Sequence, residues 1–172
     1  TPELGDYGIF ACKVKSRDVH AAYEEMKALD VNILTEPRRN PAGNEHFFVM
    51  DPWNNLFDVE QDDYCFYNEN KNTGGGNGAI LGVSDMDKSI DFYGAIMDYD
   101  KIEYDVTEVF DDLNGVPGGQ YKLRRVMLKR SMPIEGPLCE VMGTSHIELV
   151  QRIEEDGVPA PRKIYEGRLW GD

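Results

Sequence analysis

The sequence predicts an α+β protein of two tandem βαβββ units, whose mixed sheets form a cup with the helices on its outside. Three observations support this fold class. A strand-sized apolar run followed by an amphipathic helical pattern occurs twice, at residues 8–29 and 78–97. Each occurrence precedes three further strand-sized segments, and a polar, glycine-rich stretch separates the two copies. Because internal repetition fixes an architecture more firmly than local propensity does, the duplication is the basis of the prediction.

The first unit begins with residues 8–14 (GIFACKV), an apolar run with the length of a strand. Asp18 follows as a helix N-cap, because its carboxylate can accept hydrogen bonds from the free N–H groups of the first turn. One face of this helix carries the apolar residues Val19, Ala22, Met26 and Leu29. Three more strands are expected, at residues 31–35, 45–50 and 55–60, joined by turns that contain Pro or Gly.

The second unit repeats this order, with a first strand at residues 78–83. Asp87 has the place that Asp18 has in the first unit, so we expect it to cap the second helix. One face of that helix carries Met86, Ile90, Tyr93 and Met97. Further strands are expected at residues 101–107, 120–129 and 145–151. The connecting segments 108–119 and 130–144 are long enough to frame a functional site.

The repeat divides the chain into four expected segments. These are the first unit at residues 1–64, a Gly- and Asn-rich linker at 65–77, the second unit at 78–152, and a C-terminal segment at 153–172. Residues 169–172 (LWGD) are similar to residues 4–7 (LGDY), which lead into the first strand. The last segment is therefore either an extension or the lead-in to a further unit of a longer tandem protein, and the similarity can also be a coincidence of common loop residues.

Charge and cysteine content restrict the partners and the compartment. The chain has 172 residues with 32 Asp and Glu against 18 Lys and Arg, a formal charge of −14, which disfavours nucleic acid and anionic membranes as partners. No apolar run approaches the ~20 residues that a membrane-spanning helix needs. The three cysteines are widely spaced and form no CxxC pair, which indicates reduced thiols and a cytoplasmic location.

Three short stretches carry a resemblance to a known family. They are residues 83–93 (VSDMDKSIDFY), residues 51–59 (DPWNNLFDV) and residues 145–150 (SHIELV). With the tandem units, they resemble the glyoxalase/bleomycin resistance/dioxygenase superfamily, the vicinal oxygen chelate proteins. The resemblance implies a cup formed by paired units and a divalent cation (Zn, Ni, Fe or Mn) held by side chains of the first and last strands. It also implies that two neighbouring oxygens of a small-molecule substrate bind at open positions on that cation.

The ligand positions implied by the resemblance are only half filled. In the first strands, where the family usually carries His or Gln, the positions fall on Ile9 and Gly78, and neither can bind a metal through its side chain. In the last strands, where Glu is usual, they fall on Asp58 and Glu148. Glu148 is the candidate catalytic residue, because a carboxylate inside an apolar strand is costly unless it is paired or bound to a metal. The alternative for Glu148, and the favoured interpretation for Asp58, is a solvent-facing side chain.

Two neighbouring side chains extend the candidate metal site. Glu60 lies two residues after Asp58 and His146 two residues before Glu148, so each shares a strand face with its neighbour. The candidate metal ligands are therefore Glu148, Asp58, His146 and Glu60. His46 and His20 are assigned no role, because isolated histidines are usually surface or edge residues. The basic stretch of Lys122, Arg124, Arg125, Lys129 and Arg130 either binds an anionic substrate group or offsets the surrounding acidity.

These observations leave three functional hypotheses open. The first is a glyoxalase-like, metal-dependent lyase, isomerase or dioxygenase with a degenerate metal site, for which lactoylglutathione lyase is the nearest named activity. The second is a metal-free small-molecule-binding module of the bleomycin-resistance type. The third is a non-catalytic part of a longer tandem enzyme. The two units can pair with each other, with units of a longer chain, or across a dimer, and we expect a homodimer.

Overall fold

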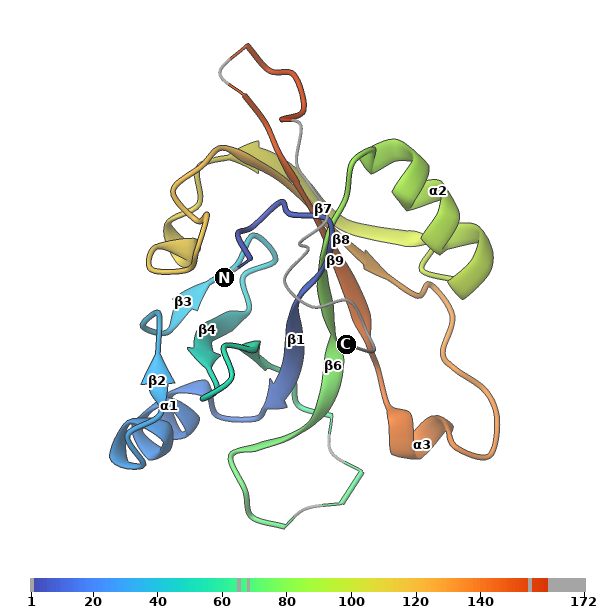
Figure 1. The fold of residues 1–172 in the computed structure, drawn as a ribbon. Helices are drawn as coiled ribbons and strands as arrows, with labels where there is room; N and C mark the ends of the chain where they lie inside the picture. Colours follow the sequence, from blue (N-terminus) through green and yellow to red (C-terminus); the bar gives the residue numbers. More distant parts are fainter. Residues whose placement is uncertain (1, 65, 68, 155, 161–172) are drawn as a thin grey trace, which may run out of the picture.

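One continuous sheet runs through both halves of the chain. In the computed structural model, which describes residues 2–64, 66–67, 69–154 and 156–160, nine strands form a mixed sheet. Its order is β2-β4-β5-β1-β6-β9-β8-β7, with β3 paired to β4 at one end. Figure 1 shows α1 and α2 at opposite ends of this sheet. The predicted α+β class with tandem units of glyoxalase type is confirmed.

The elements follow the predicted order. In the first half they are β1 (Gly8–Ser16), α1 (Val19–Ala28), β2 (Asn32–Ile33), β3 (Arg38–Arg39), β4 (Glu45–Met50) and β5 (Leu56–Gln61). In the second half they are β6 (Thr73–Gly82), α2 (Met86–Met97), β7 (Lys101–Glu108), a 3-10 turn (Asp111–Leu113), β8 (Leu123–Lys129), α3 (Cys139–Met142) and β9 (His146–Arg152). The similarity noted at residues 169–172 lies outside the described residues. No helix in the described part of the chain is long and apolar enough to cross a membrane.

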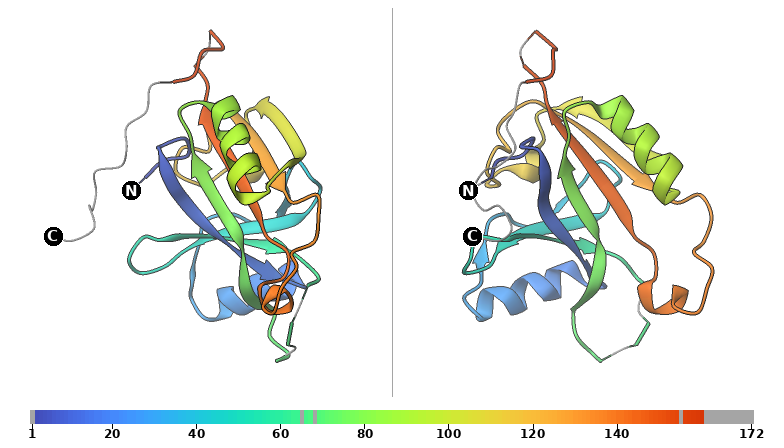
Figure 2. Two further views of the ribbon diagram at one scale, coloured as in Figure 1. Left: turned by 90° about the vertical axis from the view of Figure 1, so that its right-hand side faces the viewer. Right: turned by 45° about the vertical axis from the view of Figure 1, so that its right-hand side comes forward.

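The two halves meet through their first strands. β1 pairs with β6 in antiparallel orientation, with Lys13 opposite Gly78 and Ser16 opposite Thr73. Figure 2 shows these two strands side by side between the helices. β6 thus begins at Thr73, earlier than the predicted start at Gly78. The ladder is made by backbone groups, so the glycine-rich residues before Gly78 extend it without apolar side chains.

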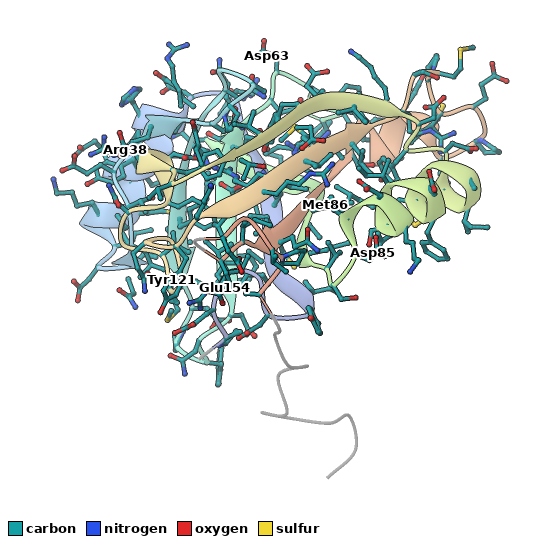
Figure 3. The ribbon with its side chains drawn as sticks, turned by 90° about the horizontal axis from the view of Figure 1, so that it is seen from above. Arg38, Asp63, Asp85, Met86, Tyr121 and Glu154 are labelled. Carbon is teal, nitrogen blue, oxygen red and sulfur yellow. The ribbon has the colours of Figure 1, made fainter. Side chains whose placement is uncertain are left out.

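The helix caps confirm one prediction and correct another. Asp18 caps α1, and its carboxylate accepts a hydrogen bond of 2.9 Å from the backbone N–H of Ala21. The cap of α2 is Asp85, which accepts a bond of 3.1 Å from the N–H of Lys88, and not Asp87. Figure 3 shows Asp85 and Met86 at the beginning of this helix. Asp87 lies inside the first turn, where its side chain no longer reaches the free N–H groups ahead of it.

Both faces of the sheet are covered, but by different side chains. On the outer face, α1 packs on β4 and β5 through one apolar cluster, and α2 packs on β8 and β9 through another. On the inner face, the segment 109–121 covers one end of the cup with Phe110, Leu113 and Val116, which join a core that includes Phe48 and Leu56. Charged and polar side chains occupy the middle of the inner face.

Gly78 of β6 lies against the backbone of β9 and should not tolerate a side chain. Its φ of +140° is unfavourable for other residues, and a Cβ there would lie 1.7 Å from the carbonyl oxygen of His146. We expect Gly78→Ala to lower the free energy of unfolding by about 2–4 kcal/mol, measured by urea titration with circular dichroism. Gly76→Ala is the matched control, because a Cβ at Gly76 meets no atom within 4 Å. Equal unfolding midpoints for the two variants would contradict the described β6–β9 contact.

Candidate functional site

Six buried charged side chains form a closed ring in the middle of the inner face. In order around the ring they are Lys13, Asp58, His46, Asp112, Arg125 and Glu148. We call this set the charged ring. Positive and negative groups alternate around it, and no member exposes more than 6% of its surface. Because an isolated charge is very costly in the protein interior, each member depends on its two neighbours.

Lys13 joins the two halves of the chain on one side of the ring, and the His46–Asp112 contact joins them on the other. The Lys13 ammonium nitrogen lies 2.7 Å from Asp58 Oδ2, 3.1 Å from Glu60 Oε2 and 3.0 Å from Glu148 Oε2. Lys13 stands opposite Asp58 in the β1–β5 ladder, which directs both side chains to the inner face. Burial by itself lowers the pKa of Lys13, but the three carboxylates outweigh it and hold the pKa well above its usual value. Lys13 is therefore a permanent cation.

His46 and Arg125 supply the other two positive charges. The His46 ring nitrogens lie 2.9 Å from Asp58 Oδ1 and 3.0 Å from Asp112 Oδ2. Burial lowers the pKa of His46, but the contacts with both carboxylates raise it to about 9, so the ring is an imidazolium at neutral pH. Arg125 closes the ring by donating to Asp112 at 2.7 Å and to Glu148 at 2.6 Å.

Glu60 lies beside the ring and is held by four neighbours. Besides Lys13, His146 Nε2 lies 2.8 Å from its Oε2. Its other oxygen accepts hydrogen bonds from the side-chain amides of Asn40 at 2.8 Å and Asn44 at 3.3 Å. Burial raises the pKa of Glu60, but Lys13 and His146 outweigh it and hold the pKa well below its usual value.

The structure brings the candidate residues together around an ammonium group. Asp58, Glu60 and Glu148 all contact Lys13, and His146 lies against Glu60. Glu148 is fully buried, as a functional carboxylate in an apolar strand should be. The expectation that Asp58 is solvated is wrong, since it is also fully buried. Lys13 stands opposite Asp58 in the ladder, and its positive charge compensates the free-energy cost of burying the Asp58 carboxylate.

This donor set does not fit a divalent cation. Every oxygen of the three carboxylates lies against a cationic group or an amide, and the Lys13 ammonium fills the point where they converge. Across the described part of the chain, no group of three or more His, Cys, Asp or Glu side chains could hold a metal ion. A dication placed against the Lys13 ammonium would be strongly repelled.

The first strands contribute no metal ligand either. The caps at Asp18 and Asp85 show that Ala11, and not Ile9, corresponds to Gly78, because each stands seven residues before its cap. Ile9 is 72% exposed on the strand. Ala11 and Gly78 both lack a donor atom, so the conclusion that this position carries no ligand is unchanged.

Four members of the ring were missed by the sequence reasoning. His46 was assigned no role, which is wrong, because it bridges Asp58 and Asp112 in the interior. Lys13 and Arg125 carried a usable signal, since each is a charge inside a strand of apolar residues, as Glu148 is. Asp112 lies in the 3-10 turn, and its sequence neighbours gave no signal that it would be buried. Arg124 points to the surface instead and binds acidic groups of β7 and α2 there.

A cavity of about 540 Å³ lies at the open end of the cup, beside Glu60. We call it the loop cavity, because residues 129–134, 139–140 and 143–145 form much of its wall. Asn77 and His146 of the sheet also line it. Asn77 is 1% exposed, and its side-chain oxygen has no hydrogen-bond partner among the described residues. The cations of the wall are engaged, Lys129 with Glu103 at 3.3 Å and Arg130 with Asp98 at 3.0 Å.

Comparison with known proteins supports the resemblance seen in the sequence. Residues 2–59 match the sequence model of the Glyoxalase/Bleomycin resistance protein/Dioxygenase superfamily. A variant of glyoxalase I from Zea mays is similar with a TM-score of 0.52 and 19% identity, over 87% of this chain and 45% of that one. A protein from Bacillus subtilis named as a candidate dioxygenase has a TM-score of 0.54 and 15% identity, over 86% and 41%. None of the curated proteins compared with the chain matches it. The chain spans less than half the length of both similar structures.

Removal of the Lys13 charge should destabilise the fold far more than removal of the charge of a surface lysine. We expect Lys13→Met to lower the free energy of unfolding by about 3–5 kcal/mol, because three buried carboxylates lose their shared cation. Lys101→Met is the control, since Lys101 is 56% exposed and pairs with Glu103, an ion pair worth below about 1 kcal/mol. Urea titration of both variants measures the difference. Similar losses would show that the buried ring contributes no more than a surface pair.

The stability of the protein should be greatest between about pH 4.5 and 6.5. The folded pKa of His46, about 9, exceeds its unfolded value of about 6.5, so its contribution is complete below pH 6.5 and is lost as the pH rises to 9. Glu60, Asp112 and Glu148 have lowered pKa values, so their contribution is lost as the pH falls below about 4.5. Thermal unfolding across pH 3–10 checks the profile. His46→Gln should remove the alkaline decline, and an unchanged decline would contradict the assignment to His46.

Proposed function

We propose that the protein is a metal-independent small-molecule-binding module, because residues 2–59 match the sequence model of the Glyoxalase/Bleomycin resistance protein/Dioxygenase superfamily and the described chain has the glyoxalase-like fold. The loop cavity holds the ligand in this proposal, and the charged ring has a structural role. The proposal rests on one observation, the Lys13 ammonium at 2.7–3.1 Å from three carboxylates. This observation favours the metal-free hypothesis over the metal-dependent lyase, isomerase or dioxygenase.

The metal-dependent hypothesis requires features that the described residues lack. A Lewis-acid mechanism needs a cation with open positions for two substrate oxygens. An ammonium group offers hydrogen bonds only, and the Lys13 ammonium has no exposed surface through which a substrate could reach it. The catalytic role of Glu148 has the same difficulty, because Glu148 is fully buried and held by Arg125 and Lys13. The residues that a substrate can reach are those of the loop cavity.

The cavity wall offers both polar and apolar groups, includes the carboxylates of Asp62 and Glu140, and disfavours an anionic ligand. Its volume of about 540 Å³ lies within the usual range for small-molecule sites, about 300–1,000 Å³. Amide and hydroxyl side chains supply the hydrogen-bonding groups, and these are Asn44, Gln61, Asn77, Ser131, Thr144 and Ser145. Met132 and Ile134 supply apolar surface. Since Lys129 and Arg130 are already paired with acidic side chains, the wall favours no anionic group. The buried oxygen of Asn77 would accept a hydrogen bond from the ligand.

A second candidate function is a non-catalytic part of a longer tandem enzyme. The observation that favours it is the coverage of the similar structures, 45% of glyoxalase I from Zea mays and 41% of the Bacillus subtilis protein. In that case the charged ring would stabilise a unit whose active partner lies in other residues. The coding sequence that flanks these residues tests this, because further βαβββ units with intact His, Gln or Glu ligand positions would support it.

The assembly and location that we propose are a homodimer in the cytoplasm. Phe92 and Ile96 of α2 and Ile102 of β7 are between 48% and 69% exposed, which is apolar surface suited to a second copy. Cys12 and Cys139 are free thiols, in keeping with a reducing compartment. Light scattering of the purified protein measures the assembly, and a monomer at micromolar concentration would overturn the dimer.

Metal analysis separates the binding module from the metal-dependent enzyme. For protein purified without chelator, we expect no stoichiometric Zn, Ni, Fe or Mn by plasma mass spectrometry. We also expect Glu148→Gln to change stability and not metal content, because Glu148 contacts Lys13 and Arg125. A stoichiometric cation that disappears in Glu148→Gln would instead support the enzyme.

Ligand-observed NMR with uncharged, anionic and cationic aromatic amides and alcohols tests the loop cavity. We expect the uncharged compounds to bind, and EDTA to leave their signals unchanged. Asn77→Leu should abolish binding without loss of stability, because it removes a buried oxygen that has no partner among the described residues. Asn114→Leu, at an exposed loop position outside the cavity, is the matched control. Equal binding by both variants would rule out the cavity as the site.

A further inference from the structure

We infer that the Lys13 ammonium takes the place of a divalent cation, and that the carboxylates around it will bind an oxygen-preferring divalent cation once the ammonium is removed. This inference goes beyond the proposed function and does not depend on what the loop cavity binds. It concerns the centre of the cup alone. The three carboxylates do not fit a divalent cation for one reason, which is that the Lys13 side chain of β1 fills the space between them.

The geometry around the ammonium is close to that of a cation site. Asp58 and Glu60 approach from β5 and Glu148 from β9, while Lys13 extends from β1, two strands away from β9. The nitrogen–oxygen distances are 2.7, 3.1 and 3.0 Å. Calcium–oxygen distances are about 2.3–2.6 Å, so the carboxylates would have to close by only about half an ångström. Carboxylate oxygens are also the ligands that Ca²⁺ and Mn²⁺ prefer.

The charge balance calls for a dication. With His46 protonated, the charged ring has three positive and three negative members, and Glu60 adds one negative charge beside it. Loss of Lys13 leaves Asp58, Glu60, Glu148 and Asp112 against Arg125 and His46. Counted without His146, which lies 2.8 Å from Glu60 Oε2, that set has two uncompensated negative charges, which one divalent cation neutralises and one sodium ion does not. Buried uncompensated charge is costly, so the difference provides a driving force for binding.

One oxygen already points at the cation without a matching donor. Glu148 Oε2 is buried and accepts no hydrogen bond from the described residues, although it lies 3.0 Å from the Lys13 nitrogen. The ammonium donates to Asp58 and Glu60, and its contact with Glu148 Oε2 is an ion pair at 3.0 Å. A spherical metal ion has no such directional requirement. Glu148 is therefore held where a metal ion would satisfy it better than the ammonium does.

The test is titration of the Lys13→Ala variant of the 172-residue chain with Mn²⁺, Ca²⁺ and Na⁺. Manganese electron paramagnetic resonance counts bound ions, and thermal unfolding measures the stabilisation. We expect one divalent ion per chain, a raised unfolding temperature with Mn²⁺ and Ca²⁺, and no response to Na⁺. The wild-type protein and Lys13→Met are matched controls, because an ammonium or a thioether fills the space. We expect at least tenfold weaker Mn²⁺ binding by both.

A double variant and a folding measurement keep the inference falsifiable. Lys13→Ala combined with Glu148→Gln should bind Mn²⁺ at least tenfold more weakly than Lys13→Ala alone. If Lys13→Ala is unfolded without metal, circular dichroism should show that Mn²⁺ or Ca²⁺ restores the fold and Na⁺ does not. The inference is overturned if Lys13→Ala neither binds nor refolds with divalent ions, or if binding is unaffected by Glu148→Gln. Failure of the proposed function would appear separately, as loss of ligand binding by the wild-type protein.

Discussion

The alternation of charge around a closed ring is the constraint on which this structure depends. Six ionised side chains are removed from water, a state that is stable only because each cation lies between two carboxylates and each carboxylate between two cations. The members come from β1, β4, β5, β8, β9 and the 3-10 turn. The ring therefore joins both halves of the chain with the segment that covers the cup. Loss of one member leaves two neighbours without compensation, so its effect extends across the whole inner face.

The ring depends in turn on the way in which the two halves meet. The β1–β6 ladder places Lys13 opposite Gly78, and Gly78 opposite His146 in the next ladder. With no side chain at Gly78, β6 lies close to β9, and the long side chain of Lys13 can reach Glu148 across it. A bulkier residue at Gly78 would widen that separation. The backbone freedom of one glycine and the reach of one lysine together unite carboxylates from separate units.

This arrangement divides the cup into three zones with different physical roles. The segment 109–121 closes one end with apolar side chains. The charged ring occupies the middle and is closed to solvent. The loop cavity lies at the open end, where side chains that can form hydrogen bonds remain accessible. A ligand in the loop cavity would therefore not require the ring to move.

The sequence alone determined the duplication and the order of the main strands and helices, because apolar periodicity and helix caps are local signals. It left Glu148 either buried or solvent-facing. It also placed Glu60 on the same strand face as Asp58, and His146 on the same strand face as Glu148, since strand alternation fixes which residues share a face. It did not decide whether those carboxylates meet a metal ion, solvent or an ammonium. Lys13 and Glu148 are far apart in the chain, and the partner of a buried charge is set by strand pairing and not by its sequence neighbours. Only the tertiary structure could show that the cation between these carboxylates is the ammonium group of Lys13.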